Sequence, residues 1–308
     1  MDESSLDLLS SLMDIQSPSG EEYRMRDFLL RYIQSQQAHW QVTPQLINPP
    51  SLGDSFLLKF GNPRTIVFAH MDTIGFMVRY GNQLIPIGGP EVKNGYRLVG
   101  EDDLGPIDCQ LVVDEHHNLF HNFPRAIRRG TSLSFKGQLT QDTNFIQSPY
   151  LDNRLGLFNA LKICETLKDG LIAFSCFEEQ GGGSVPVLLD HALEIGSIRQ
   201  ALISDITWVT EGVKHGEGVV ISIRDRNIPR RAFVNRLIQI AEDHEIAYQL
   251  EVEASGSSDG REVHESRHGL DWCFVGAPED HVHTPFEKVH LKDLEAMIKF
   301  YQVLMKEL

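Results

Sequence analysis

The sequence lacks the features that mark membrane, secreted and disulfide-bonded proteins. No stretch approaches the ~18–20 unbroken apolar residues that are needed to span a bilayer. The first five residues are acidic and have neither the basic start nor the apolar run of a signal peptide. Only four cysteines are present, none in a CxxC pair, and Cys164, Cys176 and Cys273 lie in apolar runs typical of reduced core residues. We therefore expect a cytoplasmic protein without a membrane partner.

Positive charge is also scarce. The 308 residues contain 28 Lys and Arg against 43 Asp and Glu, a formal net charge of −15. This excess disfavours nucleic acid or an anionic membrane surface as the main partner. Hydrophobic residues make up 41% of the chain, which is enough for a large core. A chain of this length is close to the point where one core gives way to two, so we expect one large domain with an insertion.

Short apolar runs alternate with amphipathic helical patterns along most of the chain. Because the runs lack polar alternation, they are typical of strands buried on both faces. The pattern predicts an α/β fold with a mixed, mostly parallel central sheet flanked by helices. The runs lie at 65–69, 171–177, 201–204 and 272–277, and the clearest helices at 157–167, 232–241 and 291–308.

One segment departs from this alternation. Residues 81–147 contain short strand-like pieces and turn signals but no convincing helix. We interpret this segment as a small inserted β-rich domain. The α/β domain would then consist of residues 1–80 and 148–308.

Acidic residues and histidines follow the apolar runs repeatedly. In open α/β sheets, ligands bind beyond the carboxyl ends of the strands, so these side chains are expected at one rim. They are His70 and Asp72 after the first run, Glu178 and Glu179 after the second, Asp205 after the third, His283 after the fourth, and Asp152 just before a helix.

Several carboxylates in one dry cleft repel one another, so their negative charge must be balanced. A pair of divalent cations would balance it. Imidazole and oxygen ligands without thiolate suit Zn²⁺, Co²⁺ or Mn²⁺. Taken singly, each residue has a plainer interpretation: Asp152 is typical of a helix N-cap, and Asp205 of a strand-end turn. The hypothesis of a metal site therefore depends on the prediction that all of these residues lie at one rim of the sheet.

Five short segments, taken in order, resemble the metal-site motifs of the tetrahedral (glutamyl) aminopeptidases. This family belongs to a wider clan of two-metal exopeptidases and deacylases. The resemblance spans nearly the whole chain, and the ordered set is far more specific than any one motif. The segments are His70-Met71-Asp72-Thr73-Ile74-Gly75-Phe76-Met77-Val78, Leu151-Asp152-Asn153-Arg154-Leu155-Gly156, Glu178-Glu179, Asp205-Ile206-Thr207 and His283-Thr284-Pro285.

The resemblance implies a role for each of these residues. Asp152 would bridge two divalent metal ions, Zn²⁺ by preference, with His70 and Asp205 completing one site and Glu179 and His283 the other. Glu178 would be the general base that takes a proton from a metal-activated water, and Asp72 would orient His70. These roles leave one carboxylate free of metal to accept the proton, as the chemistry requires.

The chain departs from the family at residue 153, at residues 279–282 and in the length of the insertion. Asn153 stands where the family often has aspartate, and the segment Glu279-Asp280-His281-Val282 lacks the usual arginine–aromatic pair.

Ser258 and Asp259 lie in the loop that corresponds to a substrate-facing loop of the family, which makes them candidate substrate-binding residues. The resemblance implies a homo-oligomer formed through the inserted domain, but the insertion is short, so a dodecamer is not part of the expectation.

The leading hypothesis is a two-metal aminopeptidase that releases N-terminal residues from short peptides. A deacylase or amidase of the same clan, acting on N-acylated amino acids, would use the same metals with a different pocket. A non-catalytic binding or assembly protein could keep the fold. A glycosidase carboxylate pair would leave the histidines without a role.

Overall fold

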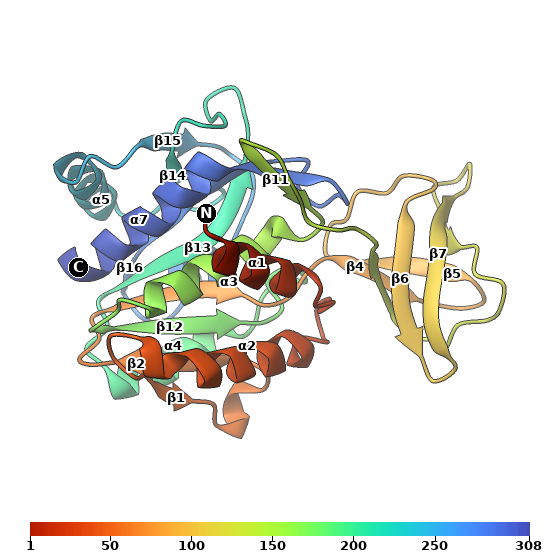
Figure 1. Cartoon of the computed structure of the whole chain (residues 1–308), viewed down its shortest axis with the longest axis horizontal. Coiled ribbons are helices and arrows are strands. Elements are labelled where there is room, and N and C mark those ends of the chain that lie inside the picture. The colour runs from red at the N-terminus through yellow and green to blue at the C-terminus, as the bar shows by residue number, and fades with distance from the viewer.

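The computed structural model describes all 308 residues, and in Figure 1 a β-barrel projects from an α/β unit. Seven α-helices surround or flank a large sheet. Two short 3₁₀ helices, η1 and η2, connect the early elements. The helices are α1 (Glu3–Met13), α2 (Tyr23–Gln36), η1 (Gln37–His39), η2 (Pro50–Leu52), α3 (Leu151–Cys164), α4 (Val185–Ile195), α5 (Arg231–Asp243), α6 (Asp259–Glu265) and α7 (Leu291–Glu307).

The sheet has eleven strands, nine of them in the order β1-β2-β12-β3-β13-β16-β17-β11-β10. The remaining two, β14 and β15, are attached through pairing of β14 with β16. The strands are β1 (Gln45–Ile47), β2 (Phe56–Phe60), β3 (Thr65–His70), β10 (Thr140–Gln141), β11 (Phe145–Ser148), β12 (Gly170–Ser175), β13 (Gln200–Trp208), β14 (Val219–Arg224), β15 (Tyr248–Val252), β16 (Asp271–Asp280) and β17 (Glu287–His290).

The centre of the sheet is parallel. Strands β12, β3, β13 and β16 are parallel neighbours, and the strands beyond them, β2 and β17, join antiparallel. Every residue of β3 is buried, and its apolar side chains alternate between the two faces of the sheet: Val67 belongs to one core and Phe68 to the other. Burial on both faces explains why these strands show no polar alternation.

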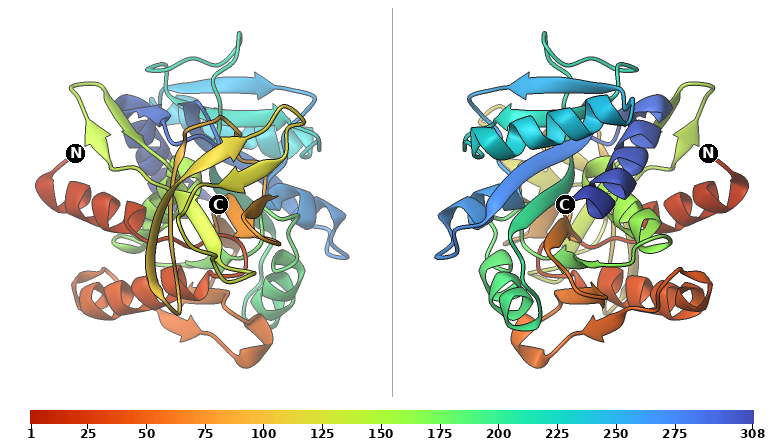
Figure 2. Two further views of the ribbon diagram at one scale, coloured as in Figure 1. Left: turned by 90° about the vertical axis from the view of Figure 1, so that its right-hand side faces the viewer. Right: turned by 90° about the vertical axis from the view of Figure 1, so that its left-hand side faces the viewer.

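Helices cover both faces of the sheet. The larger core, of 48 buried residues, lies under α1, α2, α3, α5 and α7, and the smaller, of 16, lies under α4. Figure 2 shows α5 and α7 together on the side away from the barrel. The candidate residues lie towards the carboxyl ends of the parallel strands: His70 ends β3, Asp205 lies in the second half of β13, and Glu178 and Glu179 follow β12.

Residues 75–135, which include most of the β-rich segment, fold as a closed barrel of six strands with its own core of 13 buried residues. The barrel faces the viewer in the left view of Figure 2. Its strands lie between residues 75 and 135, whereas β10 and β11 extend the main sheet, so the 81–147 segment contains strands of both sheets. The barrel strands are β4 (Gly75–Val78), β5 (Gln83–Ile87), β6 (Arg97–Asp102), β7 (Gly105–Val113), β8 (Leu119–His121) and β9 (Ser132–Phe135).

The predicted fold class, a mixed sheet flanked by helices with a small β-rich insertion, is confirmed. All four cysteines are buried and unpaired. None of the helices combines the length and the apolar character that a membrane crossing requires.

Candidate metal centre

Two groups of potential metal ligands meet at the carboxyl ends of the parallel strands. The first consists of His70, Asp152 and Asp205, and the second of Asp152, Glu179 and His283. Within each group, the potential ligand atoms lie within 4.8 Å of one another. Asp152 belongs to both groups, so its two carboxylate oxygens connect them.

The distances identify the atoms that face each centre. Nε2 of His70 lies 3.2 Å from Oδ1 of Asp152 and 3.7 Å from Oδ2 of Asp205. Nε2 of His283 lies 3.3 Å from Oδ2 of Asp152 and 3.3 Å from Oε2 of Glu179. Each imidazole therefore directs Nε2 to a different oxygen of the shared carboxylate, as expected if Asp152 bridges two ions.

Local backbone geometry turns these side chains inward. His70 is the last residue of β3, and Asp152 lies in the first turn of α3. Phe177, immediately before the glutamate pair, and His283 itself have positive φ angles of 65°. Positive φ is uncommon for residues other than glycine and clusters at functional sites, where the surrounding structure stabilises it.

Asp72 contacts His70 and the turn that carries Glu178 and Glu179. Its carboxylate accepts the backbone N–H groups of Glu178 and Glu179, each at 3.1 Å, and the Ser19 hydroxyl at 2.7 Å. Nδ1 of His70 lies 3.2 Å from the Asp72 carbonyl and 3.5 Å from its carboxylate. Asp72 thus contacts both His70 and the glutamate turn.

Glu287 connects the other ligands, and nothing in its sequence context singles it out. One carboxylate oxygen accepts the N–H of Asp152 at 3.1 Å, and the other accepts the N–H of His283 at 3.0 Å. Its side chain is fully buried. These two bonds hold the backbone at Asp152 and the backbone at His283 close to each other.

The loop after β5 of the barrel also reaches the site. Nδ1 of His283 lies 3.0 Å from the Gly89 carbonyl, a contact that leaves Nε2 free for a metal. A Cβ atom at Gly88 would lie 2.9 Å from Ile74 and 3.2 Å from Glu179, and its φ of +69° also favours glycine. The insertion therefore contributes contacts to the candidate metal centre.

The buried carboxylates of the site carry negative charge that bound cations would stabilise. Burial raises the pKa of Glu179 well above its usual range, and the charge of Asp152 raises it further. Burial opposes the protonation of His70, but Asp205 and Asp152 outweigh this effect and raise the pKa of His70 well above its ordinary value. The buried oxygens Oδ1 of Asp152 and Oε1 of Glu179 have no hydrogen-bond partner. Carboxylates in this number, with imidazole nitrogens and unpartnered oxygens, fit bound divalent cations.

Three residues predicted from the sequence, Glu178, Ser258 and Asp259, belong to neither ligand group, and two of them line the adjoining cavity. Glu178 lines the same cavity, of about 270 Å³, as Asp152 and Asp205, but belongs to neither ligand group. Ser258 also lines the cavity. Asp259 is buried and hydrogen-bonded to the Ser175 hydroxyl, and it is not among the residues that line the cavity.

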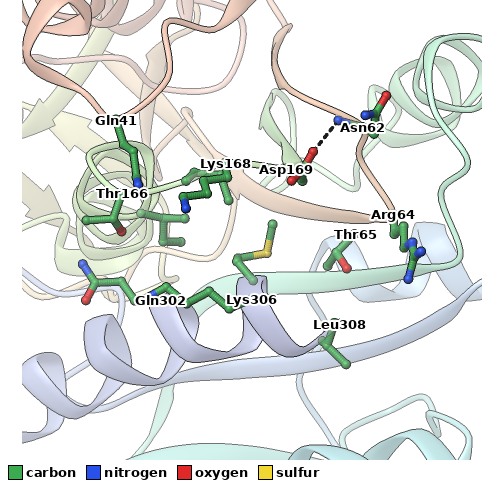
Figure 3. A pocket seen from close by; sticks show the side chains of 13 residues that line it. Gln41, Asn62, Arg64, Thr65, Thr166, Lys168, Asp169, Gln302, Lys306 and Leu308 are labelled. Atoms are coloured by element: carbon green, nitrogen blue, oxygen red, sulfur yellow. Dashed lines mark hydrogen bonds between the residues drawn. The ribbon is translucent and has the colours of Figure 1, made fainter.

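A second cavity, of about 560 Å³, lies at the other end of the sheet (Figure 3). Thr65 at the start of β3 lines it, whereas His70 ends the same strand. A strand rises about 3.3 Å per residue, so five residue steps separate the two ends by roughly 16 Å. Figure 3 shows Lys168, Asp169 and Lys306 around this cavity, which contains no group of metal ligands.

Comparison with known proteins identifies the family. The sequence profile of a family described as M42 glutamyl aminopeptidase matches residues 108–300, more than half of the chain. The chain belongs to the M42 aminopeptidase family. The resemblance seen in the motifs and the predicted enzyme class, a hydrolase of the aminopeptidase type, are thereby confirmed.

Individual proteins are similar to this chain in sequence or in fold. The chain is 25% identical, over 97% of its length and 97% of the relative's, to a protein of Acetivibrio thermocellus that is named as an aminopeptidase. Its fold is similar to that of the TET aminopeptidase of a marine-sediment Thaumarchaeota archaeon (TM-score 0.87, 19% identity, 99% of this chain and 98% of that one). It is also similar to the Pyrococcus horikoshii TET1 peptidase (TM-score 0.83, 21% identity, 99% and 100% coverage), which can assemble into a tetrahedron or a large octahedral shell.

Proposed function

We propose that this M42 protein is a two-metal aminopeptidase that removes N-terminal residues from short peptides. The observation that carries the proposal is the pair of ligand groups sharing Asp152 in one cavity. His70 and Asp205 would complete one site, and Glu179 and His283 the other. The ligand types suit Zn²⁺ first, with Co²⁺ or Mn²⁺ as alternatives.

The bound cations would polarise the scissile carbonyl and make water acidic enough to react at neutral pH. The chain's own contribution is proton transfer. Glu178 lies in the cavity without a place in either ligand group. Its carboxylate would take a proton as the water oxygen bonds to the carbonyl carbon. It would then deliver that proton to the amine nitrogen as the C–N bond breaks.

The direct test reconstitutes metal-free protein with Zn²⁺, Co²⁺ or Mn²⁺ and measures hydrolysis of aminoacyl anilides and short peptides. We expect activity to disappear on chelation, to return with metal, and to require a free α-amino group. Each peptide is therefore paired with its N-acetylated counterpart. Cleavage of the acetylated member alone would establish the deacylase alternative, and inertness with every metal and substrate would favour a non-catalytic binding or assembly protein.

We also propose that the chain forms a homo-oligomer through the barrel. Tyr80, Ile85 and Leu104 of the barrel region are large apolar residues exposed to solvent, Leu104 by 76%. Exposed apolar surface on a projecting domain is typical of protein–protein interfaces.

Sedimentation should therefore give a mass well above the 34.8 kDa of one chain. The double variant Tyr80→Glu and Leu104→Glu should sediment as smaller species. Ile228→Glu is a matched control because Ile228 is similarly exposed (58%) but lies outside the barrel. A monomeric wild type, or equal dissociation by the control, would contradict the proposal.

A further inference from the structure

The cavity that contains the metal ligands has an additional acidic wall. Besides the cluster residues, it is lined by Asp225, Glu251 and Glu253. Asp225 directly follows β14, Glu251 is on β15, and Glu253 follows that strand. None of the three belongs to a ligand group, and no lysine or arginine lines the cavity. The proposed metals would therefore leave this second set of carboxylates uncompensated.

Two of these carboxylates are deeply buried and hydrogen-bonded to neutral groups. Asp225 is 8% exposed and Glu251 is 4% exposed. Oδ1 of Asp225 accepts the N–H of Asn227, and Oε1 of Glu251 accepts the Thr207 hydroxyl. Ser222 is a further hydrogen-bond neighbour of Glu251, so the partners of both carboxylates are neutral groups.

Burial raises the pKa of both side chains, Asp225 and Glu251. His264 is the one cationic neighbour that lowers the pKa of Asp225, and neither Asp225 nor Glu251 forms an ion pair. Buried carboxylates without an ion-pair partner destabilise a fold, so their place in the wall of this cavity points to a charge supplied by a ligand.

The rest of the cavity is suited to an aliphatic chain. Ile206, Trp208 and Phe274 also line it, and they provide apolar surface next to the acids. Its volume of about 270 Å³ is below the ~300–1,000 Å³ of pockets for drug-sized ligands. Space of this size suits one amino-acid side chain and the bond to be cleaved. A lining that combines apolar and acidic side chains matches a side chain that has a methylene stem and a cationic head.

We infer that Asp225, Glu251 and Glu253 make this cavity a specificity pocket for an N-terminal residue with a positively charged side chain, lysine or arginine. The inference rests on the proposed aminopeptidase function and adds its substrate class. An N-terminal glutamate would place a further negative charge among these carboxylates and is disfavoured. An N-terminal leucine would fill the apolar part and leave the acids without a partner. The net charge of −15 also favours the approach of basic peptides.

The first test compares substrates that differ only in the N-terminal side chain. Lysyl and arginyl anilides should have kcat/KM values at least about tenfold above those of norleucyl, leucyl and glutamyl anilides. Norleucine is the decisive comparison because it keeps the lysine stem without the ammonium group. Free lysine should also inhibit hydrolysis more strongly than free norleucine. Preferential cleavage of norleucyl, leucyl or glutamyl substrates would overturn the inference and leave the aminopeptidase proposal intact, whereas inertness towards all of them would contradict that proposal itself.

The second test assigns the preference to the acidic wall. Asp225→Asn and Glu251→Gln should each lower kcat/KM for lysyl anilide by about 10- to 100-fold while changing that for norleucyl anilide by less than about threefold. Glu194→Gln, at an exposed position of α4, is the matched control and should change neither value. Metal content should stay unchanged in all three variants. A lower metal content in Asp225→Asn or Glu251→Gln would show that the wall holds a cation of its own, and equal losses on both substrates would show a structural role; either result overturns the inference.

Discussion

Replacing Glu178 with glutamine is expected to lower kcat by about 10²- to 10⁴-fold while the protein keeps its full metal content. Glutamine has the same shape as glutamate but cannot accept the proton that general-base catalysis requires. Glu178 lines the cavity and lies outside both ligand groups, so its loss should leave the ligands in place. Turnover of an aminoacyl anilide and elemental analysis of the same preparation measure the two quantities.

Glu179→Gln provides the matched control, because the residue adjoins Glu178 in sequence and differs from it in geometry. Its Oε2 lies 3.3 Å from Nε2 of His283, within the second ligand group. We expect this variant to lose about one equivalent of metal as well as activity. If Glu178→Gln lost the metal and Glu179→Gln retained it, the two assignments would be reversed. Undiminished turnover in Glu178→Gln would eliminate the proposed base.

Much of the site can be predicted from sequence because most of its residues lie at or just after the carboxyl halves of the parallel strands. The carboxyl ends of β3, β12, β13 and β16 lie at one rim, so residues such as His70 and Asp205 meet there once the strands are recognised. Buried parallel strands give continuous apolar runs, which are easily recognised. The shared position of Asp152 in both ligand groups is likewise consistent with the ordered motifs.

The supporting contacts could not be predicted in the same way. Glu287 contacts Asp152 from 135 positions away, and the Gly89 carbonyl contacts His283 from 194 positions away. Neither contact follows from strand order, because β17 joins antiparallel and the Gly89 loop comes from the barrel. Glu251 is an acid on a strand, a position that usually faces water. Its burial becomes visible only when β15 is placed beside the cavity.

The barrel illustrates a second limit of sequence patterns. Strand β4 forms the last four residues of the His70–Val78 motif, and its apolar residues are indistinguishable from those of a strand in the main sheet. Its partners, β5 and β9, place it in the barrel. Conversely, β11 lies in the β-rich segment but pairs with β17 of the main sheet. Strand membership depends on pairing partners far apart in the chain, which hydrophobic periodicity does not encode.

Asp152→Asn should abolish both metal sites at once. In the structure, Asp152 alone belongs to both ligand groups, with Oδ1 facing His70 and Oδ2 facing His283. An amide is a weaker metal ligand than a carboxylate, and it offers only one oxygen for two ions. We therefore expect less than one metal equivalent per chain and activity at the background level. Asp205→Asn and His283→Ala, which each affect one group, should lose one equivalent.

Thermal unfolding gives a readout of the same prediction that is independent of catalysis. A ligand at 100 times its Kd stabilises the native state by about 2.7 kcal/mol per site, so saturating Zn²⁺ should raise the Tm of metal-free wild type by several degrees. Zn²⁺ should hardly change the Tm of Asp152→Asn. It should raise the Tm of Asp205→Asn by about half as much as that of wild type. Asp103→Asn, an exposed carboxylate on the barrel, should behave as wild type. If Asp152→Asn kept one full equivalent and half of the Tm response, Asp152 would serve a single ion, because a bridging carboxylate cannot be removed from one site alone.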